Sequence, residues 1–115
     1  MLAYEKNWSS SLDIAVELIK VAPERVNGWV NRSYSLHELG RTQEALDGLR
    51  AVVARFPKDS IIPYNLACYA CQLGDEVGAQ NWILLATRLR PKEEVRAMGL
   101  EDPDLKPLQR FLKDL

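Results

Sequence analysis

A fixed spacing of 34 residues is the feature of this sequence that most constrains its fold. Three prolines keep this spacing, namely Pro23, Pro57 and Pro91. The same shift relates three further pairs of identical residues, Asn31 and Asn65, Gly40 and Gly74, and Ala45 and Ala79. Because several residue types keep one register together, we infer a tandem repeat. Each unit of such a repeat buries its apolar face by stacking on its neighbours.

The first full repeat has the pattern of two helices separated by a glycine. Residues 24–39 place apolar side chains at helical spacing, and Gly40 suits the left-handed conformation that ends many helices. Thr42 is the predicted N-cap of a second helix that reaches Arg55, and Pro57 closes the repeat. Small residues recur at one place in the second helices, so we expect Ala45 and Ala79 to be buried where helices approach closely.

The next repeat follows the same order. Asp59 or Ser60 is the predicted cap of its first helix, and Pro63 falls in the first turn, where a missing N–H costs little. Gly74 is the predicted stop, and Asp75 is the predicted cap of the second helix. Two helices per repeat are therefore expected here as well.

The two ends of the chain predict shorter helical segments. Ser9-Ser10-Ser11 leads into an N-terminal helix of about 13 residues. After the last repeat, a short helix at Glu93–Met98 is expected to end at Gly99. Asp102-Pro103-Asp104 begins a final segment in which Pro107 delays a regular helix by about a turn. No segment has the alternating pattern of a strand, so the predicted fold class is all-α.

The repeats resemble the tetratricopeptide-repeat (TPR) family. The matching residues are Trp29, Ala45, Leu49 and Pro57 in one repeat, and Leu66, Ala79, Ile83 and Pro91 in the next. The ending, residues 97–108, is similar to the terminal segment of a group of small bacterial TPR proteins to which no chemistry is assigned. The resemblance implies one domain over residues 1–115 with no enzyme activity, folded as a right-handed helical solenoid. Its parts are a partial repeat at 1–23, full repeats at 26–59 and 60–93, and a C-terminal cap at 94–115.

Composition disfavours several classes of function. The net charge is −1, from 15 basic and 16 acidic residues spread along the chain, so no basic stripe is present to bind nucleic acid or an anionic membrane. No apolar run is long enough to span a bilayer, and Met1–Lys6 lacks the pattern of a secretory leader, so we expect a cytoplasmic protein. With one histidine and no glycine-rich phosphate loop, neither a metal nor another cofactor is predicted.

TPR arrays generally present a concave surface made by the first helix of each pair, and the resemblance implies such a groove for a segment of a partner protein. The candidate groove residues are Asn27, Val30, Asn31, Tyr34, His37, Glu38, Ile61, Tyr64, Asn65, Cys68, Cys71 and Gln72. They are mostly neutral, which disfavours capture of an acidic peptide tail. Asn31 and Asn65 can pair with a peptide backbone, and Tyr34 and Tyr64 offer rigid aromatic contact.

Two alternatives stay open. One is a structural homodimer that forms through the ends of the solenoid, using the apolar residues Leu105, Leu108, Phe111, Leu112 and Leu115. The other is a thiol or metal sensor built from His37, Cys68 and Cys71. The simplest interpretation of the two cysteines is reduced thiols that pack in a helix, because buried positions are common for this residue.

Overall fold

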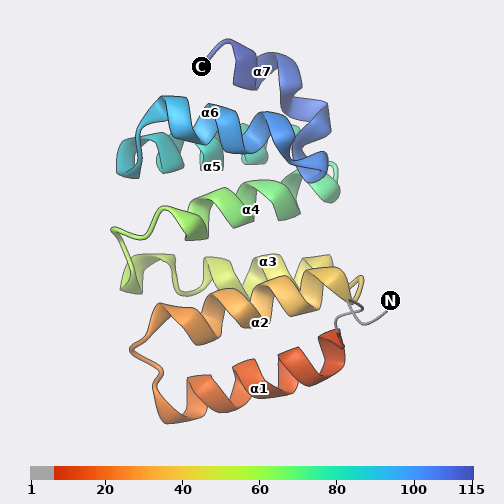
Figure 1. Cartoon of the computed structure of the whole chain (residues 1–115), viewed down its shortest axis with the longest axis vertical. Coiled ribbons are helices and arrows are strands. Elements are labelled where there is room, and N and C mark those ends of the chain that lie inside the picture. Colours follow the sequence, from red (N-terminus) through yellow and green to blue (C-terminus); the bar gives the residue numbers. More distant parts are fainter. Residues whose placement is uncertain (1–6) are drawn as a thin grey trace. The chain divides into compact units, whose positions relative to one another are not determined.

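The structure, a computed structural model, describes residues 7–115, and these residues form helices and no strand (Figure 1). The α-helices are α1 (Trp8–Val21), α2 (Val26–Glu38), α3 (Thr42–Arg50), α4 (Ile61–Gln72), α5 (Glu76–Leu89), α6 (Lys92–Glu101) and α7 (Gln109–Lys113). Two 3-10 helices, η2 (Val53–Arg55) and η3 (Pro103–Leu108), complete the fold. The all-helical prediction is confirmed. The start of the predicted partial repeat, residues 1–6, lies outside the described residues.

The helices gather into two compact units. The first extends to Val52, and within it α2 packs against both α1 and α3. The second is Val53–Leu115, in which α5 packs between α4 and α6, and η3 lies against α4. The boundary falls inside the predicted repeat 26–59. None of the helices in the described chain is long and apolar enough to cross a membrane.

The helix bounds recur at the spacing seen in the sequence. Helices α1 and α5 both have 14 residues, and their first residues, Trp8 and Glu76, are separated by twice the 34-residue period. Midway between them, α3, a short turn and η2 fill residues 42–55. Helices α2 and α4 end one period apart, at Glu38 and Gln72. The sequence period is therefore also a period of local structure.

The predicted glycine stops within the two full repeats are both confirmed. Gly40 has a φ of 81° and Gly74 a φ of 86°, the left-handed region that favours glycine. After each glycine the next main-chain N–H turns back to the preceding helix, from Arg41 to the Leu36 carbonyl at 2.8 Å and from Asp75 to the Ala70 carbonyl at 2.9 Å. These bonds satisfy carbonyl groups that a helix end would otherwise leave unpaired.

The predicted helix caps are partly confirmed. Asp75 accepts a hydrogen bond from the Gly78 N–H at 2.9 Å, and Asp59 accepts one from the Ile61 N–H, also at 2.9 Å. The prediction for Thr42 is wrong. Arg41 is the N-cap and makes no side-chain cap bond, while the Thr42 Oγ1 is 2.9 Å from the His37 Nδ1 instead. The Thr42 hydroxyl group is therefore paired with the His37 ring and does not cap α3.

The second helix of the first repeat is shorter than predicted. It ends at Arg50 instead of Arg55, and a turn and the 3-10 helix η2 follow. The small residues behave as expected, since Ala45 and Ala79 are both completely buried. At these two positions a larger side chain would have to displace its neighbours.

The prediction that Gly99 ends a helix is wrong. Helix α6 continues to Glu101, and Gly99 is buried inside it. A Cβ atom at this position would lie 2.9 Å from both δ carbons of Leu112, so the glycine allows α7 to approach α6 closely. Pro107 lies within η3 and α7 begins only at Gln109, which confirms the predicted delay of the last helix.

This contact gives a test of the C-terminal packing. Gly99→Ala should lower the free energy of unfolding by about 1–3 kcal/mol, because the added methyl group overlaps a fully buried leucine. Gly48→Ala is the matched control, since there the added methyl would meet only the guanidinium end of Arg32, which can move. The control should be neutral or up to about 1 kcal/mol more stable, as expected for alanine in a helix. Denaturant unfolding followed by circular dichroism measures both, and equal stability of Gly99→Ala and the wild type would contradict the packing argument.

Candidate functional site

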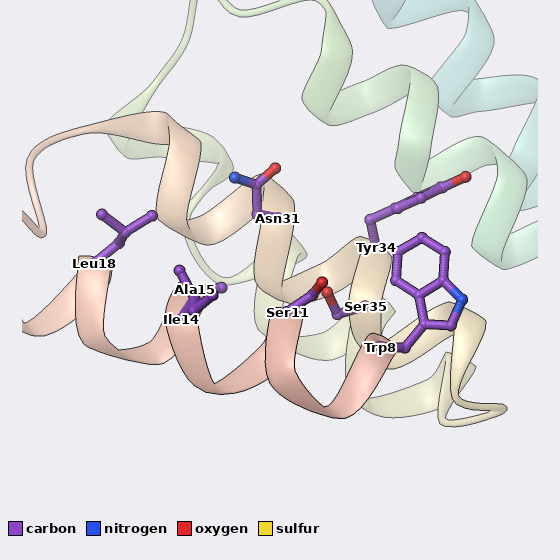
Figure 2. Close-up of a pocket in the computed structure, with 8 residues that line it drawn as sticks. All are labelled: Trp8, Ser11, Ile14, Ala15, Leu18, Asn31, Tyr34 and Ser35. Atoms are coloured by element: carbon purple, nitrogen blue, oxygen red, sulfur yellow. The ribbon is translucent and has the colours of Figure 1, made fainter. Parts of the chain in front are cut away.

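A hollow lies along the seam between α1 and α2 in the first unit (Figure 2). Its volume is about 190 Å³. The lining residues are Trp8, Ser11, Ile14, Ala15 and Leu18 of α1, and Asn31, Tyr34 and Ser35 of α2. Along α1 these residues recur at intervals of three or four positions, with Ile14 and Ala15 adjacent, so they form one stripe on the helix. None of the lining residues is charged.

An aromatic pair closes one end of this hollow. The rings of Trp8 and Tyr34 are 5.3 Å apart between centroids and meet edge to face at 75° (Figure 2). This geometry is favourable for aromatic rings and holds two flat, amphipathic surfaces at fixed positions. Tyr34 is exposed and Trp8 is half-buried, so both present part of their surface to solvent.

Asn31 lies further along the same seam. It is exposed, and its side chain makes no hydrogen bond within residues 7–115. A second hollow of about 340 Å³ shares Leu18 and Asn31 with the first. Its other lining residues are Ala22, Arg25, Asn27 and Gly28. The two hollows together form what we call the α1–α2 groove, whose one charged lining residue is Arg25.

Gly28 sets the depth of the groove at this second end. A Cβ atom here would lie 2.9 Å from the Ile19 Cγ1 and 3.2 Å from the Ile19 main-chain nitrogen. A larger residue would therefore push α2 away from α1. Close contact of the two backbones leaves Asn27 and Asn31 at the rim of the groove, on the exposed side of α2.

The structure brings three of the predicted groove residues of the first repeat, Asn27, Asn31 and Tyr34, into this groove. Val30, His37 and Glu38 line neither hollow. Sequence reasoning missed the wall formed by α1, because it assigned the groove to the first helix of each pair. The spacing of Trp8, Ser11, Ile14 and Leu18 was the signal that could have identified this wall.

In the second unit, the chain's own C-terminal segment covers much of the predicted surface. The Tyr64 hydroxyl donates to the Asp102 Oδ2 at 2.9 Å, and the Cys68 thiol donates to the same oxygen at 3.5 Å. The Gln72 Nε2 donates to the main-chain carbonyl of Asp104 at 3.0 Å. Tyr64, Cys68 and Cys71 are buried, while Ile61 and Asn65 are half-buried and Gln72 is exposed.

The Asp102 carboxylate is the centre of this contact. Its second oxygen, Oδ1, accepts a hydrogen bond from the Asp104 N–H at 3.0 Å, so the group caps η3 while it holds Tyr64 and Cys68. Leu105 and Leu108 follow directly and are fully buried. Residues 102–108 therefore belong to the core of the second unit.

A double-mutant cycle tests this contact. Tyr64→Phe should lower the free energy of unfolding by about 1–2 kcal/mol, because it removes a partly buried hydrogen bond to a carboxylate. In an Asp102→Ala background, Tyr64→Phe should leave the free energy of unfolding nearly unchanged, since the carboxylate that accepts the hydrogen bond is gone. Tyr34→Phe, in the first unit, is the control and should cost the same in both backgrounds. Additive losses for Tyr64→Phe and Asp102→Ala would show that the bond contributes nothing.

The thiol and metal alternative has a different geometry from the one predicted. Three atoms that could bind a metal ion, one each from Cys68, Asp102 and Asp104, lie within 4.8 Å of one another. His37 belongs to the first unit and is hydrogen-bonded to Thr42, and Cys71 is outside this group. Burial, reinforced by the Asp102 carboxylate, raises the pKa of the Cys68 thiol far above its usual value. Burial also raises the pKa of Cys71.

Protonated thiols are weak nucleophiles and weak metal ligands. Cys68 and Cys71 are both free and buried, which agrees with their interpretation as packing residues. We expect iodoacetamide at neutral pH to alkylate both much more slowly in the folded protein than in guanidinium chloride. Intact mass spectrometry measures the extent of reaction. Equal rates in the two solutions would contradict the burial of these thiols and favour the sensor alternative.

No family model matches the chain, and no curated protein has a significantly similar sequence.

Proposed function

We propose that this chain is a protein-interaction scaffold and that the α1–α2 groove of its first unit binds a short, uncharged segment of a partner protein. The observation that supports the proposal best is the combination of an amide, Asn31, and the Trp8–Tyr34 aromatic pair along one open, mostly uncharged groove. Concave sites that join an apolar surface to a few polar groups are typical of ligand recognition.

Each part of the groove has a role in this proposal. The Asn31 amide can donate two hydrogen bonds and accept others, which suits the main chain of an extended peptide. Trp8 and Tyr34 provide rigid contact area that costs little conformational entropy. Ile14 and Leu18 supply the apolar side of the groove. Because the groove is short, affinity for an isolated peptide should be on the order of micromolar or weaker.

The proposal includes a TPR-type arrangement of the repeats as a right-handed solenoid without catalytic activity. Its support is the 34-residue spacing, which the helix bounds and both left-handed glycines follow. The groove for the partner differs from the one expected at first. It uses α1 together with α2, and it leaves out α4, which residues 102–108 cover.

A displayed library of random twelve-residue peptides would supply ligands for the test. Selected peptides would then be titrated by calorimetry against the wild type and against the double variant Asn31→Ala, Tyr34→Ala. We expect the double variant to bind at least about tenfold more weakly, since it loses main-chain hydrogen bonds and an aromatic contact. Asn81→Ala, an exposed asparagine on α5 in the second unit, is the matched control and should bind like the wild type.

Three results would count against the proposal. The library could yield no peptide above background, or the selected peptides could bind the double variant as well as the wild type. A preference for acidic peptides that weakens steeply with salt would also contradict it, because binding would then depend on Arg25, the one cation of the groove, and not on Asn31 and the aromatic pair of Figure 2.

A further inference from the structure

The outer face of α1 carries a stripe of exposed apolar residues that overlaps the α1–α2 groove only in part. Ile14, Leu18 and Val21 are all exposed, and Val21 is the most open of them at 81%. They line a shallow hollow of about 360 Å³ together with Asp13 and Glu17. Val21 lies outside both hollows of the α1–α2 groove, so it marks this second surface alone.

The internal repeat allows this stripe to be compared with the equivalent positions of the later repeats. Leu18 is 43% exposed, whereas the residues one and two periods later, Val52 and Ala86, are 3% and 1% exposed. In the first unit α2 packs on α3, and in the second α4 packs on α5. Gly48 lies one period after Ile14. A Cβ atom on Gly48 would meet the guanidinium group of Arg32, a residue of α2. In the first unit, α2 thus covers the position equivalent to Ile14, and the positions equivalent to Leu18 are buried in both later repeats, whereas Arg55, one period after Val21, is exposed.

We propose that the outer face of α1, marked by Ile14, Leu18 and Val21, binds an amphipathic α-helix of a partner protein whose edge bears basic side chains. The repeat supplies the argument for a helix, since α2 on α3 and α4 on α5 are two examples of this packing in the chain itself. Helices that bind in this way place apolar residues three, four and seven positions apart against the partner.

Two acidic residues determine the charge of the partner. Asp13 and Glu17 lie one turn apart on the edge of the stripe, and both are exposed. Asp13 makes no ion pair in the described part of the chain, and Glu17 pairs with the exposed Lys20 at 3.0 Å. Lysine or arginine on the neighbouring edge of the incoming helix would be attracted, and acidic residues there would be repelled.

The probe is a library of displayed eighteen-residue helices that share one leucine stripe and vary at the two flanking edges. Selection on the wild-type protein should enrich lysine and arginine at one edge. The best helix, labelled with a fluorophore, would be titrated by anisotropy. Val21→Ser should weaken its binding about tenfold, because one buried valine is lost from the interface. Val77→Ser on α5 is the matched control, since Val77 is also exposed, at 70%, but belongs to the second unit.

A second pair of variants tests the charge. Asp13→Asn with Glu17→Gln should weaken binding several-fold and reduce its dependence on salt. Glu93→Gln with Glu94→Gln, two exposed acids of α6, is the control and should leave binding unchanged. Asn31→Ala with Tyr34→Ala changes no residue of the outer hollow and should weaken helix binding far less than Val21→Ser, which distinguishes this test from that of the proposed groove.

Several outcomes would overturn the inference. One is a selection without basic enrichment, and another is equal affinity of Val21→Ser and the wild type for the selected helix. A third is sedimentation of the wild type as a concentration-dependent dimer that Val21→Ser converts to a monomer, because the face would then join two copies of this chain.

Discussion

The structure depends on one constraint, which is that a helix with apolar groups on two sides must be covered on both. Helix α2 meets this constraint by packing between α1 and α3, and α5 meets it by packing between α4 and α6. The helix bounds in these two packed groups recur at the 34-residue period of the sequence. A helix side that no neighbouring helix covers needs a different partner.

In the second unit, the chain's own C-terminal segment covers the apolar surface of the repeat helices. Asp102 binds the side chains of Tyr64 and Cys68, and the leucines that follow it are buried against the repeat helices. Gly99 removes the side chain that would hold α7 away, so Leu112 can be buried completely. The energy of this closure comes mainly from the apolar side chains, and the Asp102 hydrogen bonds place the segment in register.

Within the described part of the first unit, α1 has no such covering segment on its outer face. Leu18 is exposed there, although its counterparts Val52 and Ala86 in later repeats are buried. The difference does not come from residue type, because leucine is at least as apolar as valine or alanine. It comes from how much of each side chain the neighbouring residues cover. Exposed apolar surface of this kind is a common mark of interaction sites.

The sequence predicted those features that depend on local chemistry. Gly40 and Gly74 end helices because only glycine adopts the left-handed conformation at little cost, and Asp75 caps because its carboxylate reaches the N–H three residues later. Thr42 and Gly99 were predicted wrongly because side-chain contacts outside the capping pattern decided their roles. The His37 ring, five residues earlier, pairs with the threonine hydroxyl, and Leu112 of another helix fills the space beside the glycine. A capping pattern identifies neither partner.

The candidate site, like the fold, could be predicted only in part from the sequence. Asn31 and Tyr34 were identified from the repeat position alone, and both lie in the α1–α2 groove. Cys68 lies one period after Tyr34 on α4, yet it is buried and hydrogen-bonded to Asp102 together with Tyr64. A repeat pattern states which face a residue occupies, but it does not state what other segment folds over that face.

The two proposed surfaces of the first unit are physically linked. Ile14 and Leu18 line both the groove of Figure 2 and the outer hollow of α1, so each surface uses the same two side chains. A helix docked on the outer face would fix the rotamers of these residues and change the shape of the groove beside them. Binding at one surface must then change the affinity of the other by a reciprocal factor. The sign of that coupling depends on whether the rotamers that favour the helix also leave the groove open beside Asn31, so a scaffold of this size can make one partner's binding depend on another's.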